Sequence, residues 1–174
     1  LCADHILVTR HLIHQAPEHF GAFRPVAALA AGVLGTTGME SGEMVAALVE
    51  KISPACVIAV DALASRSLGR VCRTVQLSDT GIVPGSGVGN ARFALNKETL
   101  GVPVIALGVP TVVDGATLIQ DLLGARAPEE IPGRELFVTP RAADSRGEDM
   151  SRVLGAAARL ALNPSSARGE LDRL

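Results

Sequence analysis

Four segments of the chain carry apolar residues at intervals of three and four, the spacing of one face of an α-helix. The clearest segment begins at Ser41, a residue type that caps helix N-termini, and ends before Pro54. Its apolar face is formed by Met44, Leu48, Val49 and Ile52. The same spacing predicts helices over residues 5–15, 111–123 and 147–162.

Short unbroken apolar runs between these segments are typical of strands that are buried on both faces. Residues 55–60 (ACVIAV) form one such run, which stops at Asp61. Residues 102–107 (VPVIAL) form another, and Gly108-Val109-Pro110 follows it as a predicted turn. Two weaker strand candidates are residues 24–29 and 74–77. Strands that alternate with helices predict an α/β fold, a sandwich with a mainly parallel sheet.

In sheets of this kind, ligands bind beyond the carboxyl ends of the strands. Asp61, Asp79 and the segment 108–114 all follow predicted strands, so we expect them at that edge of the sheet. The alternative for any single Asp at a strand end is a turn or helix-capping role. For Asp114 that alternative is compensation of the helix dipole in the first turn.

Composition narrows the class of protein further. The 174 residues suggest one domain, which we place at residues 1–164, followed by a frayed tail at residues 165–174. Hydrophobic residues make up 48% of the chain and aromatic residues only 2%, so the core must be aliphatic. A net charge of −2 gives no reason to expect nucleic acid or an anionic membrane as a partner. No apolar run reaches the ~18 residues of a membrane span.

Cysteines and histidines give no strong metal signal. The three cysteines, Cys2, Cys56 and Cys72, are odd in number and form no Cys-x-x-Cys pair, which favours a reducing compartment over a disulfide framework or a zinc site. The four histidines all lie in the first nineteen residues, but only His11 and His14 share a helix face clearly. Surface or packing histidines are therefore favoured over a metal cluster.

Residues 75–90 (VQLSDTGIVPGSGVGN) contain two short motifs that suggest different chemistry. Asp79-Thr80-Gly81 matches the catalytic triplet of pepsin-like proteases, but such proteases need two triplets and an all-β architecture. The stretch from Gly85 to Gly89 is rich in glycine, yet it lacks the dinucleotide spacing and the phosphate-loop lysine. A structural loop, in which glycines permit positive φ and close backbone approach, is the simpler interpretation.

The stretch as a whole is more specific than either motif. Residues 79–118, beginning DTGIVPGSGVGNARFALNKETLGVPVIALG, and residues 57–71 (VIAVDALASRSLGRV) resemble the germination proteases of spore-forming Firmicutes. The resemblance continues upstream through residues 6–12, 23–40 and 49–64, and downstream through residues 136–164. It therefore covers most of the chain in order.

This resemblance implies an endopeptidase of the spore core, in the cytoplasm of the forespore, that begins the digestion of small acid-soluble spore proteins at germination. The family is made as a zymogen that trims its own N-terminal segment, and it assembles as a homotetramer. Its fold is similar to that of hydrogenase maturation proteases, a three-layer α/β/α sandwich. Its mechanism involves two aspartates, and the family leaves open whether a divalent metal ion takes part; no cofactor is certain.

One family aspartate lies in a motif matched here by Val-Asp-Ala-Leu-Ala, which makes Asp61 the expected catalytic residue. The other lies in an Asp-Ala-Leu-Gly-Pro motif that immediately precedes the segment matched by Leu1-Cys2-Ala3. Because the sequence opens on Leu1 rather than Met, we expect this aspartate upstream of it. Val83 stands where the family commonly has a histidine, between Ile82 and Pro84.

Peptide hydrolysis without a covalent nucleophile needs a water, a general base, a general acid and oxyanion donors. The expected donors are backbone N–H groups of Gly85, Ser86, Gly87 and Gly89, with plain loop geometry as the alternative. Arg66 and Asp79 are candidates to orient or charge-balance Asp61, with an ordinary surface salt bridge as the alternative, and Asp114 is a weaker candidate. Two other functions remain open. One is an inactive sporulation protein that binds a partner, and the other is a nucleotide- or small-molecule-binding domain.

Overall fold

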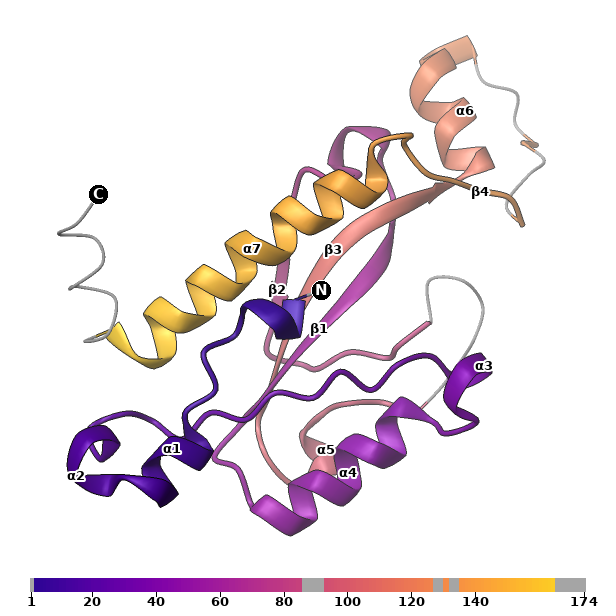
Figure 1. The fold of residues 1–174 in the computed structure, drawn as a ribbon. Helices are drawn as coiled ribbons and strands as arrows, with labels where there is room; N and C mark the ends of the chain where they lie inside the picture. The colour runs from indigo at the N-terminus through magenta and orange to yellow at the C-terminus, as the bar shows by residue number, and fades with distance from the viewer. Residues whose placement is uncertain (1, 86–92, 127–129, 132–134, 165–174) are drawn as a thin grey trace, which may run out of the picture. The chain divides into compact units, whose positions relative to one another are not determined.

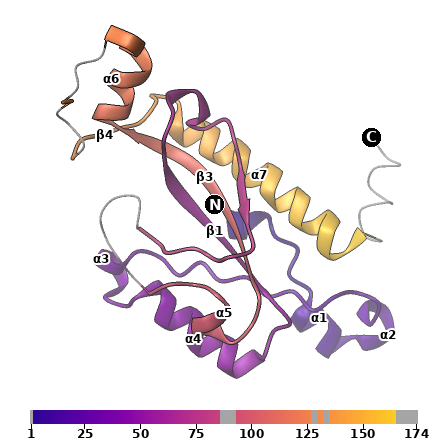
Figure 2. The same cartoon turned by 180° about the vertical axis from the view of Figure 1, so that it is seen from behind.

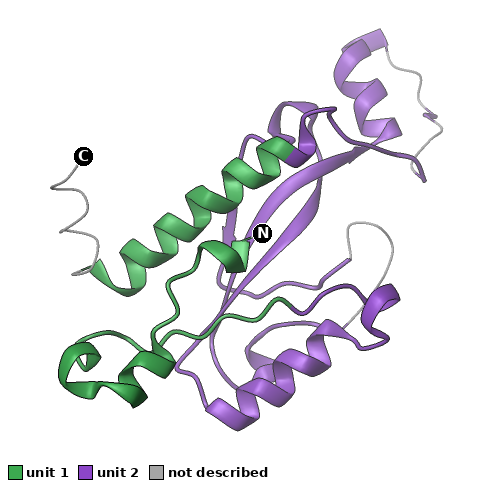
Figure 3. Ribbon diagram, in the orientation of Figure 1, with its two compact units in different colours: residues 1–30, 145–174 green, residues 31–144 purple. Residues whose placement is uncertain are grey.

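The computed structural model describes residues 2–85, 93–126, 130–131 and 135–164. The chain divides into two compact units (Figure 3). Residues 31–144 form the larger unit, and residues 1–30 with 145–174 form the split unit. The predicted tail at residues 165–174 lies outside the described residues.

Helices and strands of the larger unit are drawn in Figure 1. The helices are α3 (Leu34–Thr37), α4 (Ser41–Ile52), α5 (Lys97–Leu100) and α6 (Gly115–Leu123), with short 3-10 helices η2 (Leu68–Arg70) and η4 (Gly124–Arg126). The strands are β1 (Val57–Ser65), β2 (Gln76–Ser78), β3 (Val104–Asp114) and β4 (Phe137–Val138). The split unit contains η1 (Cys2–His5), α1 (Arg10–Gln15), α2 (Pro17–Phe20) and most of α7 (Ala143–Leu162).

The strands form one open sheet in the order β1-β3-β2, and β4 pairs with the end of β3 (Figure 2). β1 and β3 are parallel over nine residue pairs, from Val57 opposite Val104 to Ser65 opposite Val113. β2 and β4 are antiparallel to β3 over three and two pairs. The fold is therefore mixed α/β with a mainly parallel sheet, as the sequence predicts.

Both central strands are longer than their apolar runs predict. The predictions that the first strand stops at Asp61 and that a turn begins at Gly108 are wrong, because β1 and β3 continue side by side beyond this pair. Pro110 fits inside β3 because the register shifts there, between Leu63 and Ala64 of the partner strand. A bulge interrupts the regular hydrogen bonds between the strands, so a proline, which has no backbone N–H, is tolerated there.

This extension also moves the start of the following helix. The helix predicted from residue 111 begins at Gly115, after β3 has ended at Asp114. Helix α4 ends before Pro54 as predicted, although its cap position is Glu40 and Ser41 is its first helical residue. A short α5 follows Asn96, whose side chain and that of Thr99 close a capping box.

The core of the larger unit is aliphatic, as its composition predicts. One cluster on the sheet joins α4, β1, β3 and α5, and its buried members are Val49, Ala59, Leu95, Leu100 and Val104. Ile82 and Phe93 pack against this cluster. A second cluster near the end of β3 contains Val71, Cys72 and Val113.

Within the split unit, Thr9 organises the chain. Its side-chain hydroxyl donates to the carbonyl of Arg24 at 2.5 Å and accepts from the N–H of Val26 at 2.9 Å. The carbonyl of Val26 in turn accepts from the N–H groups of Thr9 and Arg10. Because these groups pair with Thr9 and Arg10 rather than with another strand, residues 24–29 do not form the predicted strand. The predicted helix over 5–15 forms only from Arg10 onward.

Helix α7 confirms the C-terminal helix that the spacing predicts, and it begins four residues earlier, at Ala143. Among the described helices, none is both long enough and apolar enough to cross a membrane.

Candidate active site on the sheet

Asp61 is the central residue of β1. Successive side chains of a strand point to opposite faces, so Asp61 shares its face with Val57, Ala59 and Leu63. Ala59 is buried in the cluster that includes Val49 of α4. The carboxylate therefore stands where the apolar core on this face of the sheet gives way to a half-exposed surface.

A backbone hydrogen bond from the next residue orients the Asp61 side chain. One carboxylate oxygen, Oδ1, accepts a hydrogen bond from the N–H of Ala62 at 2.9 Å. The side chain is half-buried, so it can be reached from solvent while its orientation is restrained. A restrained and accessible carboxylate is suited to accept or donate a proton at a bound water.

Gly108 of β3 lies directly opposite Asp61 in the parallel pair. A Cβ atom at Gly108 would lie 2.0 Å from Cδ1 of Leu63, far inside carbon–carbon contact distance. Leu63 therefore occupies the space that any other residue at position 108 would fill. The sequence pattern predicts a turn at Gly108 and gives no sign that Leu63 packs against it. The available signal was a glycine next to an apolar run, which often marks a close approach inside a strand.

β1 is an edge strand of the described sheet, because the order β1-β3-β2 leaves its other side without a partner among the described residues. Its sequence, VIAVDALAS, has Asp61 as its single charged residue. Long exposed edges normally carry charges, prolines or bulges that prevent further pairing. The composition of β1 is instead typical of a strand inside a parallel sheet. The edge next to Asp61 is thus suited to receive another extended segment.

The glycine loop begins on the same face of the sheet as Asp61. Ile82 and Leu95 exchange backbone hydrogen bonds of 2.9 and 2.8 Å that close the base of the loop, and both residues contact the cluster that contains Ala59. Gly81 has a φ of 84°, and a Cβ there would lie 2.1 Å from the Leu95 carbonyl oxygen, so only glycine fits. Val83, in the position of the family histidine, is half-buried.

Of the expected oxyanion donors, only Gly85 can be placed. It is half-buried and has a φ of 74°, a conformation that favours glycine. Ser86, Gly87 and Gly89 lie outside the described residues.

Two of the three supporting candidates lie away from Asp61 along the strands. Asp79 is exposed and follows β2, which runs antiparallel to β3. The prediction that Asp79 shares the carboxyl edge of the sheet is therefore wrong, because an antiparallel strand ends at the opposite edge. Arg66 is exposed beyond the last residue of β1, about 16 Å along the strand from Asp61 at ~3.3 Å per residue.

Asp114 forms the N-cap of α6 rather than part of a site around Asp61. Its Oδ1 accepts from the N–H of Thr117 at 2.8 Å and its Oδ2 accepts from the Thr117 hydroxyl at 2.7 Å. These hydrogen bonds from the Thr117 side chain and backbone lower the pKa of the Asp114 carboxyl below its usual value. The capping alternative for Asp114 is confirmed.

The part of the chain that the structure describes contains no cluster of metal-binding side chains. No three His, Cys, Asp or Glu side chains come close enough there to hold one. Asp61 would need ligands from outside the described residues to bind a metal ion.

Comparison with known proteins gives a consistent result. The model of the germination protease family matches residues 1–124. A germination protease of Clostridium perfringens is 42% identical over 200 residues, which cover 97% of this chain and 62% of the relative. One from Halalkalibacterium halodurans is 56% identical over 124 residues, which cover 71% of this chain and 33% of the relative. The chain thus spans less than two thirds of the length of either relative.

Proposed function

Because the chain belongs to the germination protease family, we propose that this protein is an endopeptidase that begins the degradation of small acid-soluble spore proteins when spores germinate. The position of Asp61 carries the proposal. It is the one carboxylate on the core-bearing face of β1, half-buried and oriented by the N–H of Ala62. The residue that the family motif identifies is thus also the residue whose surroundings suit proton transfer.

The proposed reaction uses two carboxylates and a water. Asp61 and a second aspartate, supplied by native residues upstream of Leu1, share the water between them. Two carboxylates in contact do not both ionise cheaply, so one is the general base and the other, protonated, is the general acid. The base removes a proton from the water as it attacks the peptide carbonyl carbon, and the acid protonates the leaving nitrogen. Backbone N–H groups of the glycine loop that begins near Gly85 stabilise the oxyanion.

The edge of β1 supports this arrangement. Asp61 lies on the strand whose other side has no partner among the described residues, and the apolar sequence of that strand is typical of a sheet interior. A further strand placed there would bring its own side chains within one interstrand spacing, about 4.8 Å, of the Asp61 backbone. The second aspartate is expected on such a segment, which would extend the sheet toward the three-layer α/β/α sandwich of hydrogenase maturation proteases.

Other family properties complete the proposal. We expect a zymogen that removes its own N-terminal segment, a homotetramer, and a location in the spore core.

A comparison of two proteins tests the proposal. The 174-residue chain is produced alone and also with its native upstream residues, and each is incubated with purified small acid-soluble spore protein. Mass spectrometry should find internal cleavage only with the longer protein, after it has processed itself. Robust Asp61-dependent cleavage by the shorter chain would contradict the two-aspartate mechanism. Absence of cleavage by both would contradict the peptidase assignment.

A further inference from the structure

Three residues form one row across the sheet. Asp61 of β1 lies opposite Gly108 of β3, and Gly108 lies opposite Gln76 of β2. Directly opposite residues of neighbouring strands point their side chains to the same face of a sheet. Asp61 and Gln76 therefore stand on one face, about 10 Å apart at ~4.8 Å per strand. β2 thus adds a polar side chain to the face that carries the candidate catalytic carboxylate.

A side-chain contact identifies this face independently of the pairing. Leu63 lies on the face of Asp61, because the two residues are two positions apart on β1. Its Cδ1 occupies the space into which a Cβ atom of Gly108 would project. The middle strand therefore places no side chain of its own between Asp61 and Gln76, and the Leu63 methyl group forms an apolar floor there.

The amide group of Gln76 is available to a ligand. Gln76 is exposed, and within the described part of the chain its side chain has no hydrogen-bond partner. A glutamine amide offers two N–H donors without a charge, and side-chain amides of this kind stabilise oxyanions in acyl transfer. The carboxylate of Asp61 is suited to proton transfer instead. The two side chains can therefore act on one peptide group in different roles.

The separation of the two positions suits one water and one peptide carbonyl group. A hydrogen bond from the water to the Asp61 carboxylate is ~2.8 Å long, and one from the Gln76 amide to the oxyanion is ~2.9 Å long. An attack distance of ~3 Å and a C=O bond of ~1.2 Å lie between these hydrogen bonds. Together the four lengths span about 10 Å, which matches two interstrand spacings.

We propose that Gln76 is a catalytic residue whose amide N–H donates to the carbonyl oxygen of the peptide that is cleaved. The water oxygen bonds to the carbonyl carbon, the π electrons of the C=O bond move onto the oxygen, and the proton of the water passes to the base. Gln76 stabilises the negative charge on that oxygen, together with a backbone N–H of the glycine loop. This role rests on the proposed peptidase function and deepens it.

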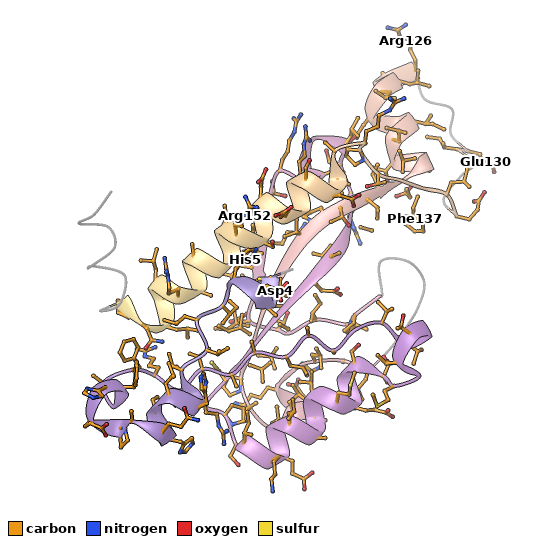
Figure 4. All side chains as sticks on the ribbon, viewed as in Figure 1. Asp4, His5, Arg126, Glu130, Phe137 and Arg152 are labelled. Carbon is orange, nitrogen blue, oxygen red and sulfur yellow. The ribbon has the colours of Figure 1, made fainter. Side chains whose placement is uncertain are left out.

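Steady-state cleavage of small acid-soluble spore protein tests this role. The protein carries its native upstream residues, and rates are expressed per chain that has processed itself. Gln76→Ala should lower kcat about 100-fold and leave KM within about threefold, because the loss of one oxyanion donor costs about 100- to 1000-fold in kcat. Gln120→Ala is the matched control and should cleave normally. Gln120 is exposed on α6, at the end of the sheet where Figure 4 labels Arg126 and Phe137.

Gln76→Glu tests the donor itself. The introduced carboxyl group has nearly the size of the amide, but it is ionised at pH 7 and can only accept hydrogen bonds. The kcat of this variant relative to the unaltered protein should be at least about 100-fold lower at pH 7. The ratio should recover about tenfold as the pH falls toward ~4.3, the usual pKa of Glu, because the protonated carboxyl donates again. A purely structural role of Gln76 predicts no such recovery.

The possible failures are distinguishable. The unfolding midpoints of both Gln76 variants should match that of the unaltered protein, since the side chain is exposed. Cleavage by Gln76→Ala at an unaltered kcat, a loss confined to KM, or a Gln76→Glu ratio that does not change with pH would each overturn the role of Gln76 alone. Absence of cleavage by the unaltered protein would overturn the peptidase assignment and this role together.

Discussion

Replacing Gly108 with alanine should destabilise the larger unit through a single contact. The new Cβ would lie 2.0 Å from Cδ1 and 2.7 Å from Cγ of Leu63, where carbon atoms normally stay 3.5–4.0 Å apart. Leu63 must then move by about 1.5 Å, and overpacking of this kind costs about 1–3 kcal/mol. Removing a glycine from a strand returns about 0.5–1 kcal/mol. An approach of 2.0 Å belongs in the upper part of the overpacking range, so the expected net loss in the free energy of unfolding is about 1–2 kcal/mol.

Urea unfolding of the chain measures this loss. With a slope of about 2 kcal/mol per molar urea, the midpoint should fall by about 0.5–1 M. Gly147→Ala is the matched control, because no atom lies within 4 Å of its added Cβ and the residue is inside α7, where alanine is favoured over glycine. Its midpoint should stay unchanged or rise.

A double-mutant cycle identifies the contact responsible. In a Leu63→Ala background the clash is absent, so Gly108→Ala should cost at least about 1 kcal/mol less than it does in the unaltered chain. Residues that do not touch give additive changes within ~0.5 kcal/mol. Additive changes at Leu63 and Gly108, or an unchanged midpoint for Gly108→Ala alone, would refute the packing described beside Asp61.

Two further predictions concern hydrogen bonds that fix local structure. Asp114→Ala removes the cap that receives the Thr117 N–H and should cost about 1 kcal/mol at pH 7 in urea unfolding. Folding lowers the pKa of the Asp114 carboxyl, so its charged form stabilises the fold above pH 3.8, the unfolded value. This stabilisation is lost as the pH falls through the folded pKa. If Asp114→Ala lowers the free energy of unfolding equally at pH 7 and pH 2.5, the charged cap is contradicted. Thr9→Val leaves the Arg24 carbonyl and the Val26 N–H without the Thr9 hydroxyl and should cost about 1–3 kcal/mol. Thr9→Ser keeps the hydroxyl, so thermal unfolding should show a smaller loss, and equal losses would refute the role of these bonds.

The elements that sequence predicts best are those with long apolar periodicity. Helices α4 and α7 each repeat an apolar face over several turns, so local sequence is enough to define them. The strand predicted at residues 24–29 fails for the opposite reason. The carbonyl of Arg24, in this segment, accepts a hydrogen bond from the hydroxyl of Thr9, which is fifteen residues away in sequence. No local sequence pattern reveals such a contact.

Strand ends depend on the partner strand more than on the local sequence. Asp61 and Gly108 each resemble a strand end when taken alone, yet they lie opposite each other in the middle of a ladder. Both strands continue past this pair because they hydrogen-bond to each other, and only the long-range pairing reveals that they continue. The identity of Asp61 as the candidate catalytic residue was therefore predictable from its motif, whereas its neighbours Gly108 and Leu63 required the structure.

The most direct test of the account is the activity of Asp61→Asn in the protein that carries its native upstream residues. Cleavage of small acid-soluble spore protein should fall to the limit of detection, while the unfolding midpoint stays close to that of the unaltered protein. Asp149→Asn, at an exposed position on α7, is the control and should cleave normally. Near-normal cleavage by Asp61→Asn would remove this residue from the site and contradict the central claim.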